Sequence, residues 1–343
     1  MVKDTVLVTG GSGFIAVYCI IQLLNEGYAV RTTVRSDAKE QLTRDMLRAA
    51  GVDPGDRLSF VRADLSSDDG WKEATQGCRF VIHGASPTPN TMTGAEENWI
   101  APARDGMLRV LRAAKEAGVQ RVVLTSAFGT ISYGHKKKLG RPFNEEDWTD
   151  TTSDIPPYQK SKTLAEKAAW DYVTNEGKGL ELATVHPVAV LGPVLATDFS
   201  HSITIIQRMM NGLPRIPKVN SGFVDVRDVA DLHWRAMTMP AASGQRFLAI
   251  SGHSHWFIDL ARMLKKRLGK RARKVSTREL PNWIVRLAAL RDPNMRMMAA
   301  QVGKVMDASG AKAEQLLGWK PRPVEDSLVD TAESLIRFGV VKV

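Results

Sequence analysis

Tyr158 and Lys162 are the residues whose types and spacing most directly predict chemistry. They stand four positions apart, which on a helix places them one turn apart on the same face. A free tyrosine has a pKa of about 10, so it needs a nearby cation to transfer a proton at neutral pH. The pair therefore predicts proton donation to an oxygen, with Tyr158 as the donor and Lys162 as its activator, as the reduction of a carbonyl by hydride requires.

A glycine-rich stretch near the start of the chain predicts a dinucleotide site. It follows a β-branched run and opens a helical stretch, and its sequence is Thr9-Gly10-Gly11-Ser12-Gly13-Phe14-Ile15-Ala16. Such glycines allow a tight turn and a close approach of backbone to a pyrophosphate, which then faces the start of the helix. The expected cofactor contacts here are Gly10, Ser12, Gly13, Phe14 and Ile15. Either motif alone is weak evidence, and the two together predict a nicotinamide-dependent oxidoreductase.

The end of the second predicted strand favours NADP(H) over NAD. An acidic residue about 20 positions beyond the glycines holds a ribose 2′-hydroxyl, whereas a 2′-phosphate prefers an arginine. The segment Val30-Arg31-Thr32-Thr33-Val34-Arg35-Ser36 has no carboxylate before Asp37. We therefore expect Arg35 to pair with the phosphate, with Lys39 as a second candidate cation.

Three further strand ends are expected to contact the cofactor. Asp64 ends the third predicted strand, where its carboxylate can accept a hydrogen bond from the adenine amino group. Small residues end the fourth strand, so backbone can run close to the ribose there, and backbone after the sixth strand is expected to meet the nicotinamide carboxamide. The expected contacts are Asp64, Leu65, Ala85, Ser86, Pro187 and Val190.

A hydroxyl beside the tyrosine should orient the substrate oxygen. The fifth predicted strand ends in Thr125-Ser126-Ala127-Phe128-Gly129-Thr130, at the place where that hydroxyl is needed. Ser126 is the leading candidate for this catalytic role, and Thr130 is the alternative. His186 is a weaker candidate for a general acid, because Tyr158 already fills that role.

Alternating strand and helix signals predict the scaffold that positions these residues. Apolar runs predict strands, and amphipathic stretches that end at a glycine predict helices. This alternation is typical of a doubly wound α/β (Rossmann) fold, whose parallel sheet binds its ligand beyond the carboxyl ends of the strands. The predicted strands are 5–8, 29–34, 58–62, 80–83, 121–125 and 182–186, and the predicted helices are 15–25, 38–50 and 101–117.

The second half of the chain is less regular and predicts a smaller, mostly helical C-terminal substrate lobe. Residues 194–221 predict a loop and a helix, 225–237 a further helix after a short strand, and 245–251 another strand. The expected division is an NADP-binding Rossmann domain over 1–193, to which 222–251 returns, and a substrate-binding lobe over 194–221 and 252–343.

The composition fits a soluble globular protein without a membrane span. Hydrophobic residues make up 43% and charged residues 24% of the chain, and no apolar run approaches the length of a spanning helix. Cys19 and Cys78 provide neither a disulfide framework nor metal-ligand spacing. The first residues lead straight into a strand and leave no room for a signal peptide, so we expect a cytoplasmic protein without a metal.

The net charge of +10 is concentrated in one segment. Between Arg262 and Lys274 lie eight basic residues and no acidic one. A solvated helix end is the favoured interpretation, and attraction to anionic lipid or to an acidic partner stays open. The chain has no zinc-finger spacing or other nucleic-acid module, so we expect a small-molecule carbonyl substrate and no nucleic acid.

Several stretches resemble the extended short-chain dehydrogenase/reductases, and more closely the group of dihydroflavonol 4-reductase, cinnamoyl-CoA reductase and related microbial aldehyde and ketone reductases. They are Val8-Thr9-Gly10-Gly11-Ser12-Gly13-Phe14-Ile15, Val30-Arg31-Thr32-Thr33-Val34-Arg35, Tyr158-Gln159-Lys160-Ser161-Lys162-Thr163-Leu164-Ala165-Glu166 and His186-Pro187-Val188-Ala189-Val190-Leu191-Gly192-Pro193. The resemblance implies a Rossmann domain with a C-terminal substrate lobe, NADPH as hydride donor, Tyr158 as proton donor and Lys162 as its activator. It also allows a homodimer, which is common in that superfamily.

One residue departs from the family pattern. The family usually has Thr-Ser-Ser, with the second serine catalytic, where this chain has Thr125-Ser126-Ala127. Either Ser126 or Thr130 replaces that hydroxyl, or the site works without it, and losing one such donor raises a barrier by about 2.7–4 kcal/mol. We therefore expect slower catalysis rather than none. The alternatives are a nucleotide-sugar epimerase or dehydratase that keeps NAD bound, and a non-catalytic NADP(H)-binding sensor.

Overall fold

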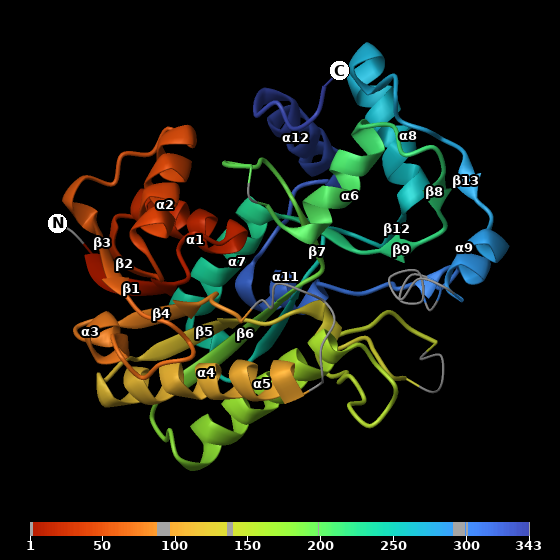
Figure 1. Ribbon diagram of the computed structural model, residues 1–343. Coiled ribbons are helices and arrows are strands. Elements are labelled where there is room, and N and C mark those ends of the chain that lie inside the picture. The colour runs from red at the N-terminus through yellow and green to blue at the C-terminus, as the bar shows by residue number, and fades with distance from the viewer. Residues whose placement is uncertain are drawn as a thin grey trace.

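A parallel sheet of seven strands lies at the centre of the molecule (Figure 1). The computed structural model describes residues 3–87, 97–135, 140–197, 199–290, 299 and 301–342. The strands are β1 (Lys3–Thr9), β2 (Tyr28–Val34), β3 (Leu58–Arg62), β4 (Phe80–His83), β5 (Arg121–Thr125), β6 (Glu181–Pro187) and β11 (Arg246–Ala249). Their order is β11-β6-β5-β4-β1-β2-β3, so the winding reverses between β1 and β4. The prediction of a doubly wound parallel sheet is confirmed, with all six predicted strands present.

Helices cover both faces of this sheet. They are α1 (Phe14–Asn25), α2 (Asp37–Ala49), α3 (Trp71–Thr75), α4 (Glu97–Glu116), α5 (Pro157–Asn175) and α7 (Val226–Thr238). Helices α1, α2 and α7 share one hydrophobic cluster with the sheet, and α3, α4 and α5 share another on the opposite face. Figure 1 shows α4 and α5 side by side beneath the sheet, in agreement with their mutual packing.

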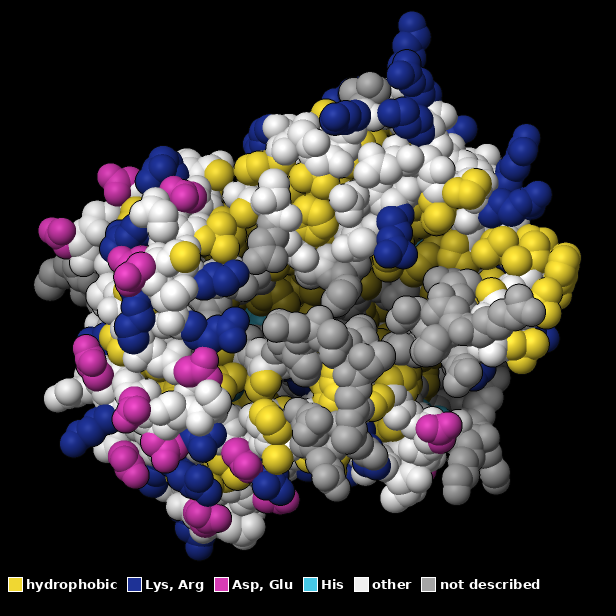
Figure 2. Space-filling model, in the orientation of Figure 1, with side chains coloured by type: hydrophobic (Ala, Val, Ile, Leu, Met, Phe, Trp, Pro, Cys, Tyr) yellow, Lys and Arg dark blue, Asp and Glu magenta, His cyan; other side chains and the backbone are white. Residues whose placement is uncertain are grey.

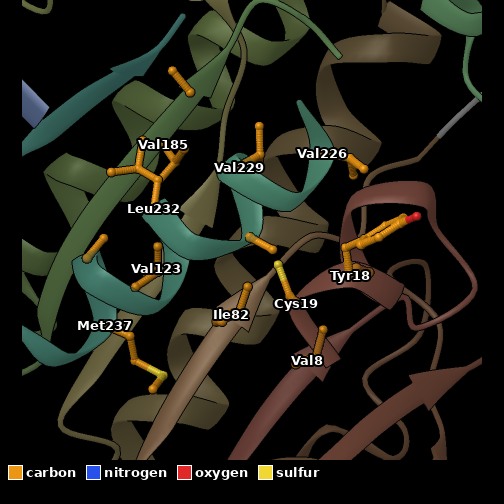
Figure 3. Packing of buried hydrophobic residues seen from close by; sticks show 14 of the residues in the cluster. Val8, Tyr18, Cys19, Ile82, Val123, Val185, Val226, Val229, Leu232 and Met237 are labelled. Atoms are coloured by element: carbon orange, nitrogen blue, oxygen red, sulfur yellow. The ribbon is translucent and has the colours of Figure 1, made fainter. Parts of the chain in front are cut away.

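Strand side chains alternate between these two layers. Val8, Ile82, Val123 and Val185 lie in the cluster beneath α7 (Figure 3), whereas Leu7 belongs to the cluster on the other face. Because both faces are covered, the central strands β4 and β5 are mostly apolar and fully buried, which is why the sequence pattern reveals them. Burying one such side chain contributes about 1.5–3 kcal/mol, so the two clusters fix the strands and hold their carboxyl ends in a row.

A smaller lobe, mostly helical as predicted, packs around a third hydrophobic cluster. Its longer helices are α6 (His201–Met210), α8 (Phe257–Leu268) and α12 (Val324–Arg337). Short elements complete the chain, namely η2 (Phe128–Thr130), β7 (Ala189–Leu191), β8 (Ile216–Pro217), β9 (Asn220–Ser221), β10 (Phe223–Asp225), η3 (Pro240–Ala242), β12 (His255–Trp256), η4 (Gly269–Ala272), β13 (Glu279–Leu280), α9 (Asn282–Ala288), α11 (Ala311–Leu317) and η1 (Gly55–Arg57). Within the described ranges, no helix combines the length and apolarity needed to cross a membrane.

The segment between the two parts of the lobe rejoins the sheet. β10 pairs with β7, α7 then packs on α1, and β11 pairs in parallel with β6 at the sheet edge. The helix predicted at 225–237 corresponds to α7, and the strand predicted at 245–251 corresponds to β11. This pairing is what we expect if residues 222–251 return to the Rossmann domain. The domain boundaries themselves stay predictions.

Candidate active site

Helix α5 carries three polar side chains at intervals of one turn, namely the predicted proton-transfer residues Tyr158 and Lys162, and Glu166. Pro157 occupies the first turn of the helix, where a missing N–H does no harm. Tyr158 packs edge-on against Trp99 of α4, with ring centroids 6.4 Å apart and ring planes at 81°. Burial raises the pKa of Tyr158, so the phenol is protonated at neutral pH, which is the state that a proton donor needs.

Lys162 keeps its charge at neutral pH in spite of its burial. Burial lowers the pKa of Lys162 to about 8, and the carboxylate of Glu166 one turn away opposes that fall. His83 at the end of β4 behaves differently, because burial, together with the nearby Lys162 charge, lowers its pKa to about 3. His83 is therefore neutral and shares a 2.8 Å hydrogen bond with Thr9 Oγ1. Of these two neighbouring groups, Lys162 is therefore the charged one and His83 is neutral.

Glu166 is the centre of a buried polar network that joins α5 to the sheet. It accepts hydrogen bonds from Ser126 Oγ at 2.6 Å, Arg246 Nε at 2.8 Å and Trp170 Nε1 at 3.3 Å. Burial acts to raise the pKa of Glu166, but the charge of Arg246 and the hydrogen bond from Ser126 act in the opposite direction, and this pKa is lowered. The carboxylate is therefore ionised, one turn along α5 from Lys162.

Arg246, the counter-ion of Glu166, comes from β11 at the edge of the sheet. Its guanidinium lies over the ring of Trp148, 3.7 Å from the centroid, and donates hydrogen bonds to the carbonyls of Glu145 and Asp147. Removing one partner of such a buried pair typically costs about 3–5 kcal/mol. We infer that the pair fixes α5 against the sheet, and with it the positions of the proton-transfer residues.

The two hydroxyls considered for orienting the substrate oxygen take part in the same network. Ser126 Oγ donates to Glu166 Oε2, while Thr130 Oγ1 donates to the Ala127 carbonyl at 3.0 Å and shares a 3.0 Å hydrogen bond with His186 Nδ1. Either hydroxyl would have to exchange a buried hydrogen bond for one to a substrate. The catalytic role of Ser126 stays a prediction.

A small cavity of about 20 Å³ lies against Lys162, at the carboxyl ends of β4 and β5. His83 and Glu166 form part of its wall. Five residues predicted from the sequence also line it, namely Leu65, Ala85, Ser86, Ser126 and Lys162. The structure thus brings the predicted catalytic lysine and serine together with expected cofactor contacts, at the sheet edge where doubly wound folds bind ligands.

The turn between β1 and α1 is shaped for backbone recognition of a phosphate. Gly10 has a φ of 71°, which suits glycine, and a Cβ on Gly11 would lie 2.3 Å from Thr32 Oγ1. The first N–H groups of α1, including those of Phe14 and Ile15, lack an acceptor within the helix. They can therefore bind a pyrophosphate together with the positive end of the helix dipole. Ser12 and Gly13 lie in the same turn.

Arg35 follows β2 directly and is exposed at the carboxyl edge of the sheet. The nearby acid that follows it, Asp37, forms an ion pair with Arg62 of β3, which also binds Glu40 at 3.1 Å. Arg35 itself forms no ion pair with another described residue. At the position expected for the ribose 2′ group, the structure therefore offers the cation Arg35, while the carboxylate of Asp37 is already paired. A cation at this position fits a 2′-phosphate.

The remaining expected contacts lie in a row along the same edge. Asp64 Oδ1, after β3, accepts hydrogen bonds from Ser66 N at 2.8 Å and Ser66 Oγ at 2.6 Å, and these bonds lower the pKa of Asp64. Pro187 and Val190 are buried at the end of β6 and in β7. The predicted contacts therefore extend from β3 across β1 and β4 to β6, as an extended dinucleotide requires.

Sequence reasoning assigned no role to Glu166, Arg246 or Trp99. Glu166 does carry a signal, because it lies two helical turns after Tyr158 on the same face. Arg246 carries none, because only the pairing of β11 with β6 brings it to its partners. His186 is fully buried and burial lowers its pKa to about 4, so it is a neutral member of the network.

Metal chemistry finds no side-chain support in the described ranges. They contain no group of three or more His, Cys, Asp and Glu side chains placed to hold an ion. Cys19 and Cys78 are both free and buried. The side chains that the structure does place at the site, Tyr158 and Lys162 among them, are of types that transfer a proton and stabilise a charged oxygen.

Known proteins share both the sequence and the fold. The model of the NAD dependent epimerase/dehydratase family matches residues 6–249. Dihydroflavonol 4-reductase from Zea mays is 35% identical over 277 residues, which cover 77% of this chain and 74% of that protein. Cinnamoyl-CoA reductase CAD2 from Medicago truncatula is 34% identical over 251 residues, covering 71% and 76%. The yeast methylglyoxal/isovaleraldehyde reductase Gre2, solved in complex with NADPH, has a TM-score of 0.80 at 27% identity, covering 98% of this chain and 99% of that one.

The chain therefore belongs to the NAD-dependent epimerase/dehydratase family. The resemblance to extended short-chain dehydrogenase/reductases is confirmed, as is the likeness to dihydroflavonol and cinnamoyl-CoA reductases. The matched region includes the glycine-rich turn, Arg35, α5 and β11, so it contains every part of the site described above.

Proposed function

We propose that the protein is an NADPH-dependent reductase that converts an aldehyde or a ketone into an alcohol. The observation that carries this proposal is the pair on α5, in which Tyr158 and Lys162 lie one helical turn apart. Burial raises the pKa of Tyr158 and lowers that of Lys162 to about 8, which keeps a proton on the phenol and a charge on the lysine at neutral pH. Lys162 also lines a cavity whose wall contains residues expected to contact the cofactor. The three relatives named above are all reductases, which supports the same chemistry.

The residues of the site supply the proton side of this reaction. NADPH, when bound, supplies the hydride that reduces the carbonyl carbon. As negative charge develops on the substrate oxygen, Tyr158 donates its phenolic proton to that oxygen. The ammonium of Lys162 stabilises the resulting phenolate, and this effect requires Lys162 to be protonated. Because its pKa is about 8, the effect is present below that pH and lost above it.

We infer NADPH rather than NADH from the end of β2. Arg35 is exposed there, while Arg62 binds Asp37, so a cation is available for a 2′-phosphate and the acid that would favour a 2′-hydroxyl is engaged. The yeast relative was solved with NADPH, which agrees with this choice. By analogy with the relatives, the substrate is a medium-sized apolar or aromatic carbonyl compound.

Oxidation of NADPH and of NADH by the purified protein, measured against a panel of aromatic and aliphatic aldehydes and ketones, tests the proposal. Turnover that favours NADPH supports it. Protein that purifies with stoichiometric NAD and oxidises neither reduced cofactor contradicts it and favours an epimerase or dehydratase. Tight NADPH binding without turnover on any carbonyl also contradicts it, and favours a sensor.

A further inference from the structure

Helix α9 lies at the outer edge of the C-terminal lobe (Figure 1). It presents an apolar face to solvent. Trp283, Leu287 and Leu290 follow one another at intervals of four and three residues, so they lie on one side of this short helical segment. Their exposed fractions are 66, 60 and 73%, whereas Val285 on the opposite side is fully buried. A cluster of large exposed apolar side chains of this kind marks an interaction surface.

Exposed cations surround this apolar face. β13, which leads into α9, pairs with β8, and a 2.9 Å hydrogen bond from Gly303 N to Lys218 O attaches a third segment beside them. Five exposed cations come from these segments, namely Arg215, Lys218, Arg278, Arg286 and Lys304. None of the five forms an ion pair with another described residue. Glu279 is the one acid in residues 213–219, 278–290 and 301–305.

Further exposed cations lie on α8, which packs on β8, and on η4 and the residue after it, namely Lys265, Lys266, Lys270 and Arg273, and none of them forms an ion pair with a described acid. The regions 194–221 and 252–343 contain 21 Lys and Arg against 10 Asp and Glu, so they hold the entire excess of positive charge. Figure 2 shows both signs of charge mixed over the sheet domain, and Lys and Arg together with hydrophobic side chains near the edge where α8 and α9 lie. We call these exposed residues of α8, η4 and α9, with their cationic rim, the α8–α9 surface.

We propose that the α8–α9 surface docks on an anionic lipid bilayer. Trp and Leu side chains flanked by Lys and Arg form the pattern of helices that lie in the membrane interface, with the apolar side inserted and the cations at the headgroups. Each Lys or Arg close to an anionic bilayer strengthens binding by about fivefold. A second copy of this chain is a poorer occupant, because a two-fold interface would bring the same cations against one another.

Cosedimentation of the full chain with lipid vesicles tests this proposal. The protein should bind vesicles of phosphatidylcholine mixed with phosphatidylserine, and not vesicles of phosphatidylcholine alone. Binding should weaken as salt rises from about 0.1 M to about 1 M, because the Debye length shortens from about 10 Å to about 3 Å. Equal binding to both compositions, or to neither, would overturn the proposal. So would self-association, seen by gel filtration, that the variant Trp283→Ser/Leu287→Ser abolishes.

Three double variants separate local docking from a general effect of charge. Lys265→Gln/Lys266→Gln should bind the anionic vesicles about 30-fold more weakly, at about fivefold for each lysine. Trp283→Ser/Leu287→Ser should bind at least about tenfold more weakly, because its insertion is lost. Lys72→Gln/Lys178→Gln removes as much charge from exposed positions of the sheet domain and should bind like the unaltered protein.

The control decides between two accounts of any binding seen. If Lys72→Gln/Lys178→Gln weakens binding as much as Lys265→Gln/Lys266→Gln, net charge alone explains it and the α8–α9 surface is no docking site. Unchanged binding by Trp283→Ser/Leu287→Ser would likewise contradict insertion of α9. Thermal unfolding verifies that each variant is folded, and the vesicle measurement uses neither cofactor nor substrate. The result is therefore independent of the proposed reductase activity.

Discussion

Charged side chains serve different purposes beneath helix α5 and on the α8–α9 surface. Glu166 and Arg246 have side chains that are 1 and 9% exposed, and they are joined at 2.8 Å. Lys265 and Lys266 on α8 are exposed and bind no described acid. A buried pair has one favourable geometry and resists screening, whereas exposed cations are screened by water and salt. A buried charged side chain thus holds its neighbours in position, whereas an exposed one contributes only to the electrostatic potential at the protein surface.

The largest effect expected from this comparison is the loss of stability when Arg246 is replaced. Arg246→Ala should lower the free energy of unfolding by about 3–5 kcal/mol, because it leaves the buried carboxylate of Glu166 without its counter-ion. Lys266→Ala should change it by no more than about 0.5 kcal/mol. Urea unfolding measures both values. Similar losses in the two variants would contradict the contrast between the regions.

Acid should destabilise the buried region and not the exposed one. Burial lowers the pKa of His83 to about 3 and that of His233 to about 4, from 6.5 when unfolded. Their stabilising contribution is therefore complete above pH 6.5 and is lost as pH falls toward these values. At pH 5 the loss should be about 2 kcal/mol for each histidine, measured by urea unfolding against pH 7.5. Stability that is constant over this range would contradict the prediction.

Arg35 represents a third situation, an exposed cation that a ligand is expected to cover. Arg35→Ser should raise the KM for NADPH by about tenfold or more, because it removes a charge-assisted hydrogen bond to the 2′-phosphate. The KM for NADH should stay unchanged. Steady-state kinetics with both cofactors measures this, and Lys72→Ser is the control for loss of an exposed cation. An equal rise for both cofactors would show that Arg35 does not distinguish them.

The smallest expected effect is a shift in the pH profile. Lys162 has a pKa of about 8, lowered by burial and supported by the Glu166 charge, while neutral His83 faces it from β4. Activity should therefore fall as pH rises through about 8, and Glu166→Gln should move this fall to lower pH because the supporting charge is gone. The pH dependence of kcat/KM measures the shift. Glu333→Gln, an exposed carboxylate paired with Arg271, should leave the profile unchanged.

A fall at the same pH in the Glu166→Gln variant would show that the carboxylate does not act on Lys162. Arg246→Lys serves as a second comparison, because it keeps the positive charge next to Glu166 but loses the planar geometry of the guanidinium. Arg246→Lys should lower the free energy of unfolding but leave the pH at which activity falls close to that of the unaltered protein. The two variants together separate the charge of the network from its geometry.

The sheet domain was more predictable than the lobe for a physical reason. Parallel strands buried on both faces, such as β4 and β5, are continuous apolar runs that a single sequence displays. The strands β8, β9, β12 and β13 of the lobe have two residues each, which is too short for any periodicity to appear. Tertiary packing, rather than local pattern, decides their structure.

Only those parts of the site whose residues lie close together in the sequence were predictable. The positions of Tyr158 and Lys162 on one helix face follow from their separation alone. The engagement of Ser126 with Glu166, 40 residues later in the chain, does not follow from it, and neither does the pairing of Arg246 with Glu166 across 80 residues. Long-range partners of buried polar groups become visible only when the sheet order is known.

The most direct test of the account is the effect of Tyr158→Phe, which removes the phenolic oxygen but keeps the ring that packs on Trp99. NADPH oxidation with the best carbonyl substrate should fall by about 10²–10⁴-fold, the usual contribution of a positioned proton donor. NADPH binding, followed by fluorescence titration, should change little. A variant that binds NADPH and reduces the carbonyl at the rate of the unaltered protein would contradict the role of Tyr158 and the proposed mechanism with it.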